Sequence, residues 1–149
     1  LTGCDISTDD IDAMKILLVE DSATLRYAMS RYITNAGHEP IFAENGEKAM
    51  QMVETEEEID MIIMDVEMPG LNGFETTRLL REILKDHWIP IIFVTGKNDE
   101  EDLEQGINAG GDDYLIKPVS QVILQAKIRA MERLREMRDQ LKELNNELT

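Results

Sequence analysis

Met61-Ile-Ile-Met-Asp-Val-Glu-Met-Pro-Gly-Leu-Asn-Gly73 is the stretch that decides the fold. Four apolar residues run without a polar break and end on one carboxylate, Asp65. A continuous apolar run bounded by turn residues indicates a strand buried on both faces, as in a parallel sheet. Asp65 then lies at the carboxyl end of its strand, which is the edge where open α/β sheets bind their ligands.

Other apolar runs repeat this arrangement along the chain. Besides 61–65, they predict strands at 15–20, 40–44, 90–95 and 112–116. Apolar residues at helical spacing follow each strand and predict helices at 22–35, 45–53, 74–86, 99–108 and from 119 to the end. This alternation predicts an α/β fold with right-handed crossovers and a parallel sheet covered on both faces.

Composition narrows the functional classes. The chain has 149 residues, of which 42% are hydrophobic and 31% charged, as expected for one globular domain. The net charge of −16 argues against direct binding of nucleic acid or an anionic membrane, which require a basic surface. Cys4 is the single cysteine, and no signal peptide or membrane-spanning run is visible. We therefore expect a cytoplasmic protein.

The chain divides into three parts. Residues 1–13 are acidic and lack periodicity, which predicts a flexible N-terminal segment. Residues 14–130 form the folded domain, and 131–149 extend the last helix. Apolar residues continue there in steps of four and three, which predicts a coiled-coil seam and a weak homodimer. The alternative is an amphipathic helix that packs on its own domain or frays. The seam comprises Ala130, Leu134, Met137, Leu141, Leu144 and Leu148.

Polar side chains follow four of the five predicted strands. They are Glu20 and Asp21 after the first, Asp65 after the third, Thr95 after the fourth and Lys117 after the fifth. The carboxyl ends of parallel strands share one edge, so these groups can converge. Three crowded carboxylates repel one another, and their oxygens suit a hard divalent cation such as Mg²⁺. Because Mg²⁺ prefers few carboxylates together with water and phosphate, this set predicts a site for a phosphoryl group.

Three of these residues suit phosphoryl transfer. Asp65 can act as the nucleophile and form an acyl phosphate. Lys117, together with Mg²⁺, can neutralise charge on the phosphoryl oxygens. The hydroxyl of Thr95 can donate to a phosphoryl oxygen and so report its presence.

The motifs together resemble those of a known family, the receiver domains of bacterial two-component response regulators. The resemblance covers residues 15–130. It implies a flavodoxin-like doubly wound sheet of five parallel strands in the order 2-1-3-4-5, with five helices, and a phosphorylation-activated signalling switch. The motifs that carry it are Val19-Glu-Asp-Ser22, Met64-Asp-Val-Glu-Met-Pro-Gly-Leu-Asn-Gly73, Val94-Thr95 and Tyr114-Leu-Ile-Lys-Pro118.

The resemblance implies a role for each site residue. Asp65 accepts the phosphoryl group from a histidine kinase. Glu20 and Asp21 hold Mg²⁺, Asp21 more directly, and the backbone carbonyl of Glu67 completes the protein's ligands.

The resemblance also implies a switch. Thr95 moves toward the phosphoryl group and the Tyr114 ring moves inward, which changes the face formed by the fourth helix, the fifth strand and the last helix. The bond between Lys117 and Pro118 is expected to be cis.

The implied partners are a sensor histidine kinase or phosphotransfer protein, and a C-terminal output domain of diguanylate cyclase, phosphatase or kinase type. The only reactions expected are the chain's own phosphotransfer and autodephosphorylation, without turnover of a separate substrate. The chain departs from the family at Gly96, where alanine is usual. Glu67 and Lys97 occupy positions that flank the phosphoryl group, and we expect them to form a salt bridge across the site mouth.

Two other functions use similar residues. A phosphatase of the haloacid dehalogenase type also uses Asp, Thr or Ser, Lys and Mg²⁺, but its nucleophile ends the first strand. A degenerate receiver that only binds proteins would not need the complete set. Tyr114 can also be an ordinary edge aromatic, and Trp88 is expected to pack near its strand. His38 and His87 lack paired ligands and are expected on the surface.

Overall fold

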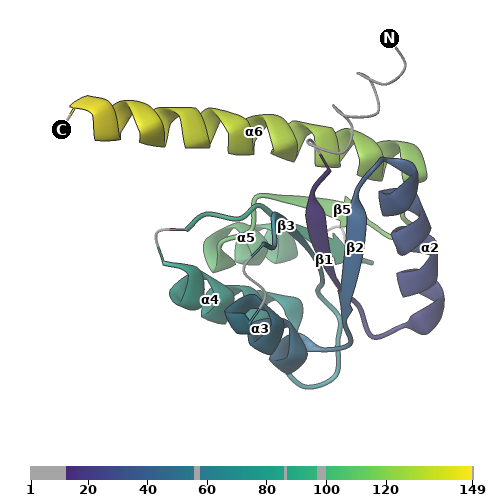
Figure 1. The fold of residues 1–149 in the computed structure, drawn as a ribbon. Helices are drawn as coiled ribbons and strands as arrows, with labels where there is room; N and C mark the ends of the chain where they lie inside the picture. Colours follow the sequence, from purple (N-terminus) through teal and green to yellow (C-terminus); the bar gives the residue numbers. More distant parts are fainter. Residues whose placement is uncertain (1–12, 56–57, 86, 97–99, 149) are drawn as a thin grey trace, which may run out of the picture.

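The computed structural model describes residues 13–55, 58–85, 87–96 and 100–148. In this part of the chain, five parallel strands form one sheet in the order β2-β1-β3-β4-β5 (Figure 1). The predicted fold class and strand order are therefore confirmed. The strands are β1 (Lys15–Val19), β2 (Glu39–Ala43), β3 (Met61–Asp65), β4 (Ile91–Thr95) and β5 (Asp113–Ile116).

Helices cover both faces of the sheet. One face packs against α2 and α6, and the other against α3, α4 and α5 (Figure 1). The interior is accordingly split into two apolar clusters, one on each side. The helices are α2 (Ala23–Asn35), α3 (Gly46–Thr55), α4 (Gly73–Leu84), α5 (Glu100–Ala109) and α6 (Gln121–Leu148).

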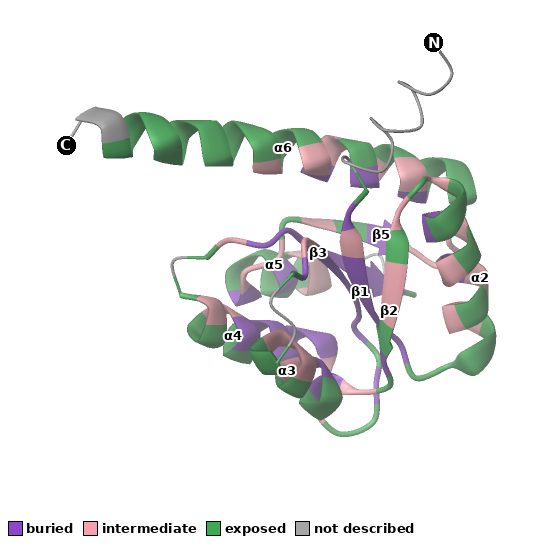
Figure 2. Cartoon of the chain, viewed as in Figure 1, coloured by how far each residue is buried: buried purple, intermediate pink, exposed green. Residues whose placement is uncertain are grey.

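The central strands are buried as their apolar sequence predicts. Every residue of β3 and β4 is buried (Figure 2). Alternate residues serve opposite faces: Ile62 and Met64 join the cluster under α3–α5, whereas Met61 and Ile63 join the one under α2 and α6. Burial on both faces explains why β3 shows no polar alternation.

Several helix ends differ from the prediction by one or two residues, and two of these differences have a clear local cause. The last helix begins at Gln121 rather than at 119, because the Ser120 hydroxyl accepts a hydrogen bond from the Ile123 amide at 3.4 Å. Helix α4 ends at Leu84 rather than at 86, because Lys85 has a φ of 50° that leaves helical geometry. The predicted start of the fourth helix at 99 lies outside the described residues.

The long helix α6 belongs to the core only in its first half. Leu124, Ile128 and Met131 are buried against the sheet and α2. Beyond them the seam residues are exposed, with Leu141 at 62%. The Leu148 side chain lies outside the described residues.

Two contacts still tie the second half of α6 to the domain. Arg135 pairs with Asp60 at 2.7 Å, and the Arg138 guanidinium lies 5.1 Å from the centre of the Trp88 ring. Trp88 therefore packs on α6, in agreement with the structural role expected for it. None of the described helices is long and apolar enough to cross a membrane.

The prediction that His38 is a plain surface residue is wrong. Its side chain is half-buried, and Nδ1 accepts a hydrogen bond from the Met14 amide at 2.9 Å. Burial lowers the pKa of His38, which favours the neutral ring that can accept this bond. His87 is exposed as predicted, and the bond between Lys117 and Pro118 is cis as predicted.

Candidate functional site

The structure brings the predicted acidic residues together at the carboxyl edge of the sheet. Glu20 and Asp21 follow β1, and Asp65 ends β3, which pairs directly with β1. One carboxylate oxygen from each of the three residues lies within 4.8 Å of the others. The acidic cluster expected from the sequence therefore exists in the folded chain.

Two oxygens of this cluster are buried without a partner. Glu20 and Asp65 are each 1% exposed, whereas Asp21 is exposed. Oε1 of Glu20 and Oδ2 of Asp65 accept no hydrogen bond from the described residues. Buried carboxylate oxygens normally have a donor or a cation, because an uncompensated buried charge is costly. These oxygens, with the accessible carboxylate of Asp21, fit a hard divalent cation such as Mg²⁺.

The crowding also changes the protonation of the cluster. Burial raises the pKa of the Glu20 carboxyl to about 8, against the effect of a hydrogen bond from the Ser22 amide, and the nearby charge of Asp65 raises it further. Burial also raises the pKa of Asp65, although Lys117 opposes this effect. Without a cation, Glu20 therefore tends to keep a proton at neutral pH.

Lys117 supplies the positive charge at this edge. Its Nζ lies 3.0 Å from Oδ1 of Asp65. Burial alone would lower the pKa of Lys117, but the hydrogen bond and charge of Asp65 raise it, so the side chain stays cationic. The Lys117 amide donates to the Thr95 carbonyl at 2.9 Å, which joins the loop after β5 to the end of β4.

The loop after β3 holds Asp65 in place by close backbone packing. The Gly73 amide donates to the Val66 carbonyl at 3.0 Å, and the Val66 amide donates to the Val94 carbonyl at 2.9 Å. A Cβ atom at Gly73 would collide with the Asp65 carbonyl. Asn72 caps α4 through a capping box with Glu75, so the chain leaves the edge directly into a helix.

The Glu67 side chain, expected from the sequence to form a salt bridge at the site mouth, contacts groups at two other strand ends that were not predicted. Its Oε1 accepts the Thr95 hydroxyl at 3.0 Å and the Gly96 amide at 3.1 Å, and Oε2 lies 3.6 Å from Nζ of Lys117. Burial would raise the pKa of Glu67, but these donors together hold it below its usual value. The expected partner, Lys97, lies outside the described residues. The sequence contained a clue to these contacts, because Glu67 is two residues after Asp65 and so lies at the same edge of the sheet as Thr95 and Lys117.

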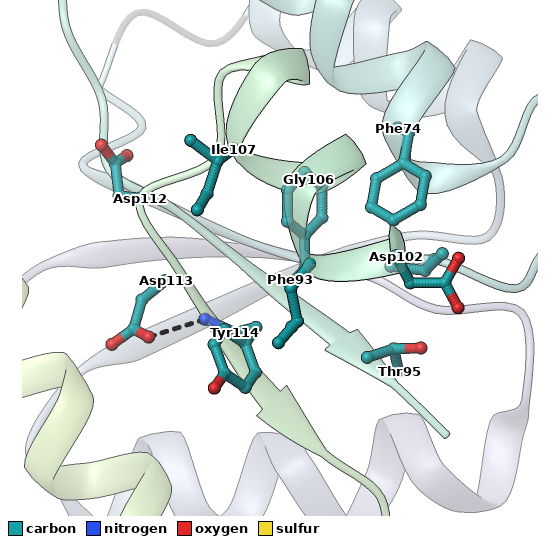
Figure 3. A pocket seen from close by; sticks show the side chains of 12 residues that line it. Phe74, Phe93, Thr95, Asp102, Gly106, Ile107, Asp112, Asp113 and Tyr114 are labelled. Atoms are coloured by element: carbon teal, nitrogen blue, oxygen red, sulfur yellow. Dashed lines mark hydrogen bonds between the residues drawn. The ribbon is translucent and has the colours of Figure 1, made fainter. Parts of the chain in front are cut away.

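Thr95 and Tyr114 lie beside one cavity of about 110 Å³ (Figure 3). Thr95 is buried at the end of β4, while Tyr114 is 39% exposed as a residue, and Nζ of Lys127 lies 5.5 Å from the centre of its ring. Phe93 and Ile107 line the wall between β4 and α5. The two residues expected to form a switch therefore line the same cavity.

Comparison with known proteins agrees with this geometry. Residues 16–129 match the family described as response regulator receiver domain, and the chain belongs to that family. Receiver domains of two-component response regulators are phosphorylation-activated signalling domains.

Several relatives place the chain within this family. It is 38% identical over 116 residues to the transcriptional regulatory protein AfsQ1 of Streptomyces coelicolor, covering 78% of this chain and 50% of that protein. It is 39% identical over 117 residues to protein PilH of Pseudomonas aeruginosa, covering 78% of this chain and 96% of PilH. The chain thus spans about half the length of AfsQ1 but nearly all of PilH.

A solved structure agrees as well. Chemotaxis protein CheY4 of Vibrio cholerae superposes with a TM-score of 0.75 at 28% identity, covering 80% of this chain and 98% of CheY4.

The raised pKa of Glu20 predicts a pH-dependent stability in metal-free buffer. Between its ordinary value of 4.5 and about 8, the folded chain keeps a proton on Glu20 that the unfolded chain loses. The free energy of unfolding contributed by Glu20 therefore falls as the pH rises. Glu20→Gln has no such proton, so its stability relative to wild type should rise across this window in denaturant titrations.

Glu44→Gln is the matched control, because that side chain is 63% exposed just beyond β2. A stability difference between Glu20→Gln and wild type that stays constant with pH would contradict the prediction.

Proposed function

We propose that Asp65 accepts a phosphoryl group from the phosphohistidine of a sensor kinase or phosphotransfer protein. The observation that carries this proposal is the position of Asp65, buried at the carboxyl edge with an unpartnered oxygen, a lysine at 3.0 Å and two neighbouring acids. No other described carboxylate combines these features.

The transfer requires only groups at this edge. A carboxylate oxygen of Asp65 attacks the phosphorus, the P–N bond to the donor imidazole breaks, and the electron pair leaves with the imidazole. The product is an acyl phosphate on Asp65. Lys117 then faces a phosphoryl oxygen as well as Asp65 and offsets the added charge.

Mg²⁺ is the cofactor that this donor set suits. The carboxylates of Glu20, Asp21 and Asp65 and the backbone carbonyl of Glu67 would hold it. When bound, it supplies positive charge against the phosphoryl oxygens. Asp21 is the exposed member of this set, whereas Glu20 and Asp65 are buried.

The output is a change of conformation. A phosphoryl group adds charge and strong acceptors, so the Thr95 hydroxyl can exchange Glu67 for a phosphoryl oxygen. Tyr114 then turns toward the cavity that it shares with Thr95, which alters the surface of α5, β5 and α6. Ile107 and Ile123 on this surface are 73% and 52% exposed, which suits a partner-binding face.

The chain's own phosphotransfer and autodephosphorylation are the only reactions in this proposal. A haloacid dehalogenase type of phosphatase is less well supported, because the candidate nucleophile ends β3 rather than the first strand. A degenerate receiver is less well supported too, because the acidic, threonine and lysine positions are all filled.

We place the domain in the cytoplasm, upstream of an output domain joined through α6, of diguanylate cyclase, phosphatase or kinase type. The match covers only 50% of AfsQ1, a transcriptional regulatory protein, so such relatives have room for a further domain. The exposed stripe of Leu134, Met137, Leu141 and Leu144 supports a second proposal, a homodimer through the second half of α6.

Phosphorylation is tested by intact-protein mass after incubation with acetyl phosphate and Mg²⁺. Wild type should gain one phosphoryl group, because Asp65 is the single acceptor. Asp65→Asn and a wild-type sample with EDTA should gain none. An adduct of equal yield on Asp65→Asn would refute the assignment.

Dimerisation is tested by sedimentation over a concentration series, with and without beryllofluoride. We expect concentration-dependent association that Leu141→Lys weakens, because a charge would enter the apolar seam. Asn146→Lys adds the same charge at a heptad position on the face away from the seam and should leave association unchanged. A monomer under both conditions would exclude the dimer.

A further inference from the structure

The carboxylate of Glu67 interacts with the hydrogen-bond donors of the site. It accepts hydrogen bonds from the Thr95 hydroxyl at 3.0 Å and the Gly96 amide at 3.1 Å, and it lies 3.6 Å from the ammonium of Lys117. These donors come from the ends of β4 and β5, two different elements, and converge on one acidic group. The convergence of three donors on one carboxylate indicates a site shaped for an anion.

A phosphoryl group on Asp65 needs these same donors. Lys117 already bridges the two acids, since its Nζ is 3.0 Å from Asp65 and 3.6 Å from Glu67. A group added to Asp65 therefore enters the space between Lys117 and Thr95, where the Glu67 carboxylate now lies. Both groups are negatively charged, so they repel each other as well as share donors.

Glu67 can leave this position without disturbing the fold. Its side chain is 38% exposed, so the carboxylate can turn toward solvent without opening the core. The backbone of Glu67 is held separately, by an amide that faces Oδ1 of Asp65 at 3.4 Å. The carboxylate is thus a movable group on a fixed backbone.

We propose that the Glu67 carboxylate is a built-in anionic occupant of the phosphoryl site, which holds Thr95, Gly96 and Lys117 in the resting chain and must be displaced before Asp65 is phosphorylated. This inference rests on the proposed function and adds a regulatory device to it. Glu67 acts through its competition for donors and takes no part in bond making. It raises the threshold for phosphorylation and keeps the Thr95 hydroxyl occupied until a stronger anion arrives.

The test is a beryllofluoride titration at saturating Mg²⁺, followed by the ¹⁹F NMR signal of the bound species. Glu67→Gln keeps the shape and an acceptor but removes the charge, and Glu67→Ala removes the occupant. Both should bind beryllofluoride about fivefold or more tightly than wild type, as expected for the loss of a partly exposed competitor for charged donors. Mg²⁺ affinity, measured separately by calorimetry, should not fall in either variant.

Glu44→Gln is the matched control, because it removes one negative charge from the same edge of the sheet outside the donor set. It should bind beryllofluoride as wild type does. Equal affinity of wild type and Glu67→Gln would overturn the inference while leaving the proposed function intact, and so would weaker Mg²⁺ binding by Glu67→Gln. If neither wild type nor Glu67→Gln binds beryllofluoride, both proposals would be overturned.

Discussion

The crowding of negative charge around Asp65 is the constraint on which the site depends. Two of the three clustered acids are almost fully buried, and each has an oxygen that no described group satisfies. Lys117 offsets part of this charge at Asp65, while burial, together with the nearby charge of Asp65, raises the pKa of Glu20. Burying carboxylates in this way is unfavourable unless positive charge is added nearby. A divalent cation at this edge of the sheet can supply that charge.

The parallel sheet makes this crowding possible. The direct pairing of β1 with β3, and of β3 with β4, sets Glu20, Asp65 and Thr95 side by side, while the Lys117 amide is tied to the end of β4. Gly73 then lets the chain pass close to the Asp65 carbonyl, where a Cβ atom would collide. Thr95, at the end of β4, also lines the cavity beside Tyr114.

Much of this could be predicted from the sequence, because it depends on strand ends. The apolar run before Asp65 identified a buried strand, and the order of the elements placed Glu20, Asp21, Asp65, Thr95 and Lys117 at one edge. The contacts of the Glu67 carboxylate with Thr95, Gly96 and Lys117 were not predicted, because these partners come from two other strand ends and depend on side-chain direction. The role of His38 was missed for a similar reason, since its partner, the Met14 amide, lies 24 residues away in the chain.

The central claim is that a charge added at Asp65 is relayed through Thr95 to Tyr114. A crystal structure of the chain with Mg²⁺ and beryllofluoride tests it most directly. The account predicts that the Thr95 hydroxyl leaves Glu67 for a fluoride, and that the ring of Tyr114, a residue now 39% exposed, moves into the cavity beside Thr95. A bound analogue with Thr95 still donating to Glu67 and the Tyr114 ring still outside would contradict the account.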